Sequence, residues 1–139
     1  MSKASNGTNV YQLEYMIEVL NISNYKGYYS KNELVNLVPT NKECLLINLQ
    51  NSTDGNGTHH LALWKNGDDV RYFDSYGCPI PKEIEDYLKH FHIKYYRSLD
   101  NKYPDKLIQK LGSDICGELC VLFLFLCSKF SYTEIIENL

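Results

Sequence analysis

Hydrophobic residues near the start of the chain recur at three- and four-residue intervals, the spacing of an amphipathic helix with one apolar face. The residues in this pattern are Tyr11, Leu13, Met16, Ile17 and Leu20. Ser30 can cap a short second helix that runs through Leu37, because Glu33 stands at the capping-box position three residues later. The mostly apolar run over residues 44–49 has the length of a buried strand. This part of the chain therefore predicts two helices followed by a strand.

Residues 59–74 form two β-like runs around the Asn-Gly dipeptide at 66–67, which suits a tight hairpin. If that dipeptide is the two-residue loop, the register places His59 directly opposite Asp74, with Cβ atoms about 4.5–5.5 Å apart. A bulge or a longer loop would shift the register by one residue and exchange His59 for His60. Apolar residues on both faces predict an inner hairpin covered on both sides: Leu61, Leu63, Val70 and Tyr72 on one, Ala62, Trp64 and Phe73 on the other.

The rest of the chain continues this alternation of helical and extended segments. The pattern predicts a helix that follows Pro81 and runs through Phe91, a strand over 94–99, an extended connection over 101–113, a helix over 115–128 and a short last helix over 132–139. Ser113 or Asp114 can cap the helix over 115–128. After Glu118 this helix is apolar nearly all round, which predicts a place at the centre of the core.

Composition narrows the class of protein. A chain of 139 residues, 44% hydrophobic and 22% charged, fits one domain over 1–139, with residues 1–9 expected to be flexible. The net charge of -3 provides no basic stripe, so nucleic acid is expected to be at most a secondary partner. The longest apolar run is too short to cross a membrane, and the polar start predicts a protein that is not secreted and keeps its thiols free. The five cysteines lack metal-ligand spacing, so neither a metal nor another cofactor is expected.

Cys116 is the candidate nucleophile. It falls in the first turn of the apolar helix, where free backbone N–H groups and the helix dipole stabilise a thiolate. Gly117 beside it would let the backbone of a substrate approach closely. A cysteine on an apolar helix is more often a small buried hydrophobe, so the assignment depends on its partners. A thiolate needs a base and a group that orients the base, and the hairpin brings His59 and Asp74 together for these tasks, with His60 as the competing base.

Other polar residues bear less directly on this site. Gln109, seven residues before Cys116, could donate its side-chain amide to an oxyanion alongside the backbone N–H of Cys116. A glutamine in a loop is more often simply solvated. His90 and His92 stand at the end of a polar helix and are interpreted as surface residues.

Four short motifs, in order and spacing, resemble the adenovirus-type maturation cysteine proteases, which are relatives of the SUMO-specific proteases. The motifs are Gly57-Thr58-His59, Tyr72-Phe73-Asp74-Ser75-Tyr76-Gly77, Gln109 and Ser113-Asp114-Ile115-Cys116-Gly117. Residues 24–34 are similar to an aromatic-x-Gly segment before an acidic-Leu pair in viral members. One position departs from the pattern: the family usually has tryptophan directly after the catalytic histidine, where this chain has His60.

The resemblance implies an α+β fold of the papain-like type in permuted order. In that fold a central mixed β-sheet is flanked by helices, and the nucleophile lies at the N-terminus of a buried helix. The implied roles are His59 as base, Asp74 as orienting group, Gln109 in the oxyanion hole and Cys116 as nucleophile, with Gly117 and His60 next to the substrate. The departure at His60 leaves the choice between the two histidines open.

The resemblance also implies a viral thiol endopeptidase that cleaves capsid or core precursors at glycine-containing sites during virion maturation. A monomer acting in the virion and the infected cell is expected. The adenovirus-type relatives are stimulated by a viral peptide and by DNA, and the acidic balance of this chain argues against help from DNA. Cys78 could tether such a peptide through a disulfide, or have no role. A SUMO- or ubiquitin-like deconjugase shares the chemistry, although a chain of 139 residues leaves little surface for a modifier. A binding module that keeps the triad positions as core residues is the non-enzymatic alternative.

Overall fold

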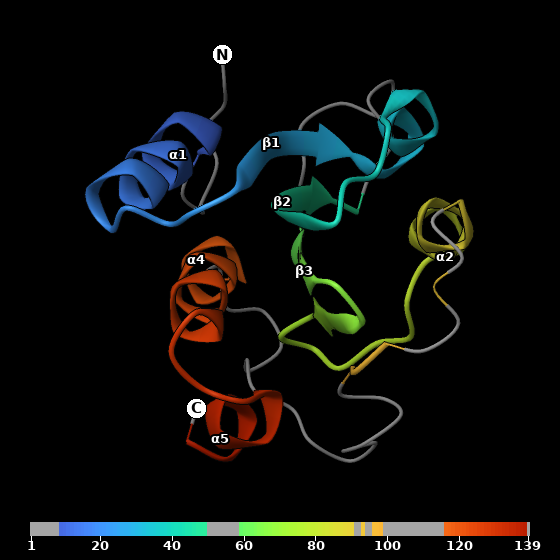
Figure 1. Ribbon diagram of the computed structural model, residues 1–139. Coiled ribbons are helices and arrows are strands. Elements are labelled where there is room, and N and C mark those ends of the chain that lie inside the picture. Colours follow the sequence, from blue (N-terminus) through green and yellow to red (C-terminus); the bar gives the residue numbers. More distant parts are fainter. Residues whose placement is uncertain (1–8, 50–58, 91–92, 94–95, 99–115, 139) are drawn as a thin grey trace.

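A four-stranded mixed sheet in the order β1-β2-β3-β4 forms the centre of the computed structural model (Figure 1). The structure describes residues 9–49, 59–90, 93, 96–98 and 116–138. The strands are β1 (Tyr25–Ser30), β2 (Lys42–Asn48), β3 (His60–Asn66) and β4 (Asp69–Phe73). The helices are α1 (Val10–Val19), the 3-10 helix η1 (Lys31–Asn36), α2 (Lys82–Lys89), α4 (Cys116–Cys127) and α5 (Tyr132–Glu137). The architecture is therefore mixed α+β, as predicted.

The sheet separates two hydrophobic clusters, because successive side chains of a strand point to opposite faces. On β2, Cys44 and Leu46 face α1, α4 and α5, whereas Leu45 and Ile47 face η1 and α2. The hairpin residues divide in the same way, with Ala62, Trp64 and Phe73 in or against the first cluster and Leu61, Leu63, Val70 and Tyr72 in the second. The prediction that both faces of the hairpin are covered is confirmed.

Helix α1 differs from its prediction on one position. Leu13 and Ile17 are buried and point toward the core, but Tyr11 is 85% exposed. Two helical residues rotate the side chain by about 200°, so a helix that buries Leu13 turns Tyr11 to the solvent. The helix begins where the Asn9 side chain accepts the backbone N–H of Gln12, a capping interaction that the apolar pattern does not reveal.

Strand β1 was not predicted from the sequence. It pairs in parallel with β2, and its register shifts between Tyr25 and Gly27. Gly27 has a φ of 144°, a conformation that favours glycine, and this irregularity interrupts the alternation by which a strand is normally found. The predicted capping contact at the end of β1 is present, since the backbone N–H of Ser30 donates to Glu33 Oε1 at 2.8 Å, and the helix that it opens is the 3-10 helix η1.

The predicted hairpin register is wrong by two residues. The ladder pairs Asn66 with Asp69, so the loop consists of Gly67 and Asp68. Gly67 has a φ of 64°, which suits glycine at the first position of a two-residue hairpin loop. A shift of two residues keeps every side chain on its predicted face, whereas a shift of one would have exchanged the faces. His59 and Asp74 therefore remain on the same side of the hairpin.

Replacing Gly67 by alanine is expected to lower the free energy of unfolding by about 1 kcal/mol, because a left-handed backbone is unfavourable for a residue with a Cβ. No atom lies within 4 Å of that Cβ position, so the effect would come from the backbone alone. Urea unfolding of this variant measures it, with the exposed neighbour Asp68→Ala as control. Equal stability of Gly67→Ala and the parent protein would contradict this turn.

The later helices lie close to their predicted ranges. Of the predicted strand over 94–99, the described part forms one parallel bridge between Arg71 and Arg97. The connection over 101–113, the caps Ser113 and Asp114, and residues 1–8 of the segment 1–9 that is expected to be flexible lie outside the described residues. Asn9, the last residue of that segment, caps α1. None of the described helices has both the length and the apolar character needed to cross a membrane.

Candidate active site

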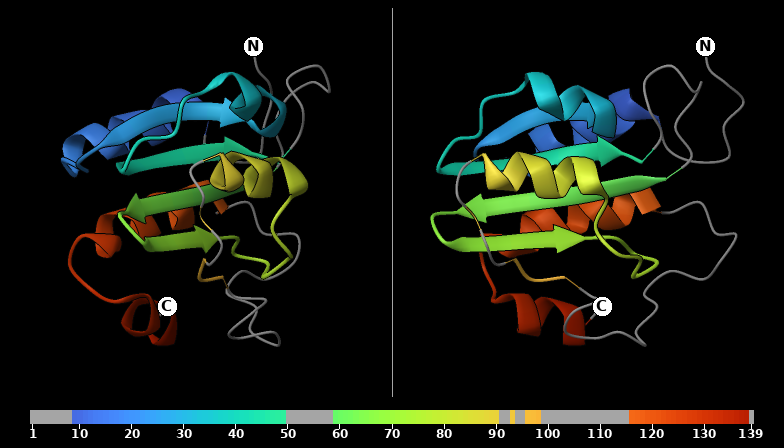
Figure 2. Two further views of the ribbon diagram at one scale, coloured as in Figure 1. Left: turned by 45° about the vertical axis from the view of Figure 1, so that its right-hand side comes forward. Right: turned by 90° about the vertical axis from the view of Figure 1, so that its right-hand side faces the viewer.

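Three elements begin or end at the same end of the sheet and bring the candidate residues together. The start of β3, the end of β4 and the start of α4 lie at one end of the sheet (Figure 2). His59 precedes β3, His60 opens it, Asp74 follows β4, and Cys116 is the first residue of α4. All four side chains are buried. Residues as far apart in the chain as His59 and Cys116 thus form one cluster.

His59 and Asp74 form a direct hydrogen bond. His59 Nε2 donates to Asp74 Oδ1 at 2.7 Å. The same oxygen accepts the backbone N–H of Tyr76 at 2.9 Å, the local contact of a turn that begins with aspartate. The Tyr76 ring stacks on the His59 ring, with centroids 4.5 Å apart and planes at 11°. Asp74 is therefore a turn residue and an orienting group at once, and the imidazole of His59 is held by an acceptor and by a ring.

The Cys116 sulfur lies beside both histidines, and its described hydrogen bond is with His60. Its distance to His60 Nδ1 is 3.3 Å. Because Asp74 holds Nε2 of His59, Nδ1 is the nitrogen left for the thiol. Nδ1 is buried and reaches ordinary hydrogen-bond geometry with no described group. The His59 ring and the sulfur nevertheless influence each other, since each shifts the pKa of the other.

The two pKa values at the site move in opposite directions. Burial alone would raise the pKa of the Cys116 thiol, but the neighbouring His59 ring and the hydrogen bond with His60 outweigh it and lower the pKa to about 6. Burial alone would lower the pKa of His59, but Asp74 and the Cys116 sulfur raise it to about 9. A proton shared by these groups therefore rests on the imidazole at neutral pH. The site is arranged to hold a thiolate beside an imidazolium.

Alkylation of Cys116 by iodoacetamide is expected to speed up as the pH rises through about 6. The thiolate is the reacting form, and an ordinary thiol would need a pH of about 8.5. Peptide mapping by mass spectrometry after timed exposure between pH 4.5 and 9 gives the rate at Cys116 separately from the exposed Cys78. A midpoint at Cys116 above pH 8 would show that the imidazoles do not stabilise its thiolate.

Gly117 has a different surrounding from the one predicted. A Cβ at this position would lie 3.0 Å from Cδ1 and Cδ2 of Leu13 and 3.4 Å from His60 Nδ1. The missing side chain thus makes room for α1 and for the His60 ring. Leu13 fills the space on the side where a Cβ would lie, and the close approach of a substrate backbone to this glycine stays a prediction.

The remaining predicted residues are placed as follows. Gln109 and His92 lie outside the described residues, and His90 is exposed, as predicted. In the part of the chain that the structure describes, no three His, Cys, Asp or Glu side chains are grouped to hold a metal ion.

Two tyrosines at the site were not predicted. Tyr76 stacks on His59, and Tyr28 from β1 meets the His60 ring edge-on, with centroids 5.7 Å apart and planes at 63°. Tyr76 could have been found from its position two residues after Asp74, where an aspartate turn places a backbone N–H. Tyr28 could not, because its contact depends on a strand that the sequence pattern hides.

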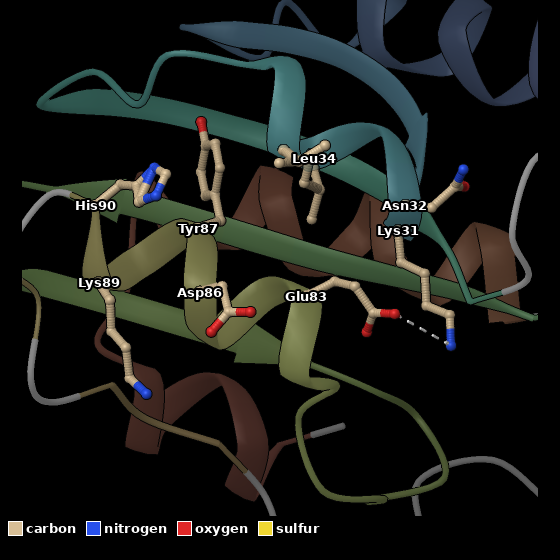
Figure 3. A pocket seen from close by; sticks show the side chains of 9 residues that line it. Lys31, Asn32, Leu34, Glu83, Asp86, Tyr87, Lys89 and His90 are labelled. Carbon is tan, nitrogen blue, oxygen red and sulfur yellow. Dashed lines mark ion pairs between the residues drawn. The ribbon is translucent and has the colours of Figure 1, made fainter.

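A separate hollow of about 400 Å³ lies between η1 and α2, on the other face of the sheet from α4 (Figure 3). Leu34 and Tyr87 contribute its apolar part, and an ion pair between Lys31 and Glu83 spans 3.9 Å at its rim. None of the predicted site residues lines it. The chemistry suggested by the sequence therefore belongs to the end of the sheet and not to this hollow.

A scan against models of known protein families finds no match, and a search of curated proteins finds no relative.

Proposed function

We propose that this protein is a cysteine endopeptidase with Cys116 as nucleophile, His59 as general base and acid, and Asp74 as the group that orients His59. The observation that carries the proposal is the buried hydrogen bond from His59 to Asp74, next to a Cys116 thiol whose pKa is lowered to about 6. A nucleophile, a base and an orienting group are the parts that acyl transfer by a thiol requires.

In the first half of the reaction, the Cys116 thiolate attacks the carbonyl carbon of the scissile peptide bond. A carbon–sulfur bond forms, and the carbonyl electron pair moves onto oxygen. When the oxyanion collapses, the carbon–nitrogen bond breaks, and the leaving amine takes the proton from His59 Nδ1. The product is a thioester on Cys116 and a neutral His59, still oriented through Nε2 by Asp74.

In the second half, water attacks the thioester while His59 Nδ1 takes up one of its protons. Collapse of the new oxyanion breaks the carbon–sulfur bond, which releases the acid product and restores the thiolate beside an imidazolium. The backbone N–H of Cys116 and the side-chain amide of Gln109 remain the proposed donors to both oxyanions.

For the substrate, we propose capsid or core precursors cut at glycine-containing sites in the virion or the infected cell. The support is the resemblance of the motifs around His59, Asp74, Gln109 and Cys116 to the adenovirus-type maturation proteases. The chain order of base, orienting group and nucleophile fits the permuted papain-like arrangement of that family. We propose that the protein acts as a monomer and that a viral peptide could activate it.

The test compares three substrates with the parent protein and with Cys116→Ser. They are a capsid precursor of the same virus, and fluorogenic substrates that carry the C-terminal residues of SUMO and of ubiquitin. We expect the parent protein to cleave the precursor next to glycine, and we expect Cys116→Ser to cleave none of the three substrates.

Two results would contradict this proposal. Turnover of the SUMO or ubiquitin substrates without cleavage of the precursor would favour a deconjugase. Absence of turnover on all three, together with a thiol that alkylates only at alkaline pH, would favour a binding module.

A further inference from the structure

His60 has the shortest described contact with the candidate nucleophile. Its Nδ1 lies 3.3 Å from Cys116 Sγ, and its own carbonyl oxygen accepts from Cys120 Sγ at 3.3 Å. As the first residue of β3 it points to the α4 side of the sheet, where Ala62 of the same strand also lies. The Tyr28 ring from β1 meets the His60 ring edge-on and limits its movement on that side.

The two histidines differ in their partners. Asp74 accepts a hydrogen bond from His59, but within the described residues no carboxylate accepts one from His60. An imidazole N–H donates to an acceptor within hydrogen-bond distance, and the Cys116 sulfur is the acceptor described at that distance from Nδ1 of His60. In addition, the backbone N–H of His60 contributes to holding the sulfur as an anion. His60 is thus placed to donate a hydrogen bond to the sulfur, whereas His59 is placed to act as the base.

We propose that His60 is a second catalytic residue, whose Nδ1–H donates to the Cys116 sulfur and stabilises the thiolate, while His59 alone takes up and delivers protons. The catalytic role of His60 depends on the proposed endopeptidase function. Its hydrogen bond to the sulfur does not, because that bond can be measured on the resting protein. His60 therefore has a task at the position where the similar proteases usually have a tryptophan.

The other titratable groups around the sulfur come from four elements. His59 lies before β3, Asp74 follows β4, Cys120 lies one turn along α4, and Tyr28 comes from β1. Burial raises the pKa of Cys120 and of Tyr28, so both stay neutral over the working range. The charge on the sulfur is therefore set by Asp74 acting through His59 and by the donor on His60.

Three variants separate donation from proton transfer. His60→Asn places an amide N–H near the position of Nδ1 but cannot carry a proton to or from a substrate. His60→Phe keeps a ring against Tyr28 and removes the N–H, and His60→Gln extends its amide toward the position of Nε2. Thermal unfolding of each variant identifies any that fails to fold. His60→Phe and His60→Gln each remove the donor at Nδ1, so one of them can be used if the other does not fold.

The first measurement is the pH dependence of Cys116 alkylation by iodoacetamide. We expect the midpoint near pH 6 to be kept in His60→Asn and to rise by about one pH unit in His60→Phe or His60→Gln, a loss of about tenfold in thiolate stability. An unchanged midpoint in the loss variants would overturn the donation. An equal rise in all three would also overturn it, because the Asn amide should replace the donor.

The second measurement is turnover of a glycine-containing peptide. We expect His60→Asn to stay within about tenfold of the parent protein and the loss variants to fall further. A low midpoint with abolished turnover in His60→Asn would show that His60 carries the proton and would overturn the division of roles. If the parent protein cleaves no peptide while the midpoints behave as expected, the endopeptidase proposal fails and the donation by His60 stands.

Discussion

Replacing His59 by alanine is expected to slow peptide hydrolysis by about 10²–10⁴-fold, the usual contribution of a general acid and base. The variant loses the ring that connects Asp74 with the thiol, and with it the proton that the leaving amine must receive. Measuring kcat/KM on a glycine-containing peptide gives the size of the loss. Thermal unfolding of the same sample separates a lost base from a lost fold.

The matched control is His90→Ala, which removes an exposed histidine and should leave kcat/KM unchanged. Asp74→Asn should lie between the two, because the ring stays but loses its carboxylate. If His59→Ala keeps most of the activity, the base is another group, and His60 would be the first to consider.

Replacing Glu43 by glutamine is expected to lower the free energy of unfolding by about 3 kcal/mol, since removal of one partner leaves a buried charge unpaired. Glu43 Oε1 accepts from Lys26 Nζ at 2.8 Å and Glu43 Oε2 from Lys65 Nζ at 3.1 Å. Tyr87 on α2 also donates to Oε2, at 2.5 Å. Lys65 is only 1% exposed, so water cannot replace the lost carboxylate. The contacts connect three strands with α2, far from Cys116 along the sheet.

Urea unfolding at pH 7 measures this effect, with Asp86→Asn as the control that removes a carboxylate from an exposed ion pair with Lys82. Burial alone would raise the pKa of Glu43, but its partners lower it from 4.5 to about 2. Its stabilisation is therefore complete above pH 4.5 and disappears as the pH falls toward 2. Glu43→Gln should remove this part of the acid dependence, and an unchanged profile would contradict the assignment.

The hairpin shows why much of the site could be predicted from the sequence. The predicted loop was displaced by one residue toward the N-terminus, which moved the register by two, yet His59 and Asp74 kept a common face because side chains alternate with a period of two. His59 and Asp74 come into contact because the start of β3 lies next to the end of β4. The two residues do not need to be a direct cross-strand pair. Face was predictable from polarity, whereas register depended on the backbone of Gly67.

Other parts of the site depend on packing between distant segments. On the side of Gly117 where a Cβ would lie, Leu13, more than a hundred residues earlier, fills the space. The contact of Tyr28 with His60 required β1, whose irregularity at Gly27 conceals it. The helix that carries Cys116 was predictable from its apolar length. Which ring would touch its sulfur was not, because both histidines are adjacent and only the fold places each of them.

The most direct test of the central claim is covalent capture of Cys116 by a peptide whose C-terminal glycine carries a vinyl sulfone. We expect one adduct per protein at pH 7, mapped to Cys116, faster than any adduct at the exposed Cys78 and much slower in His59→Ala. Capture at Cys116 no faster than at Cys78, or a rate that His59→Ala leaves unchanged, would contradict a nucleophile activated by His59.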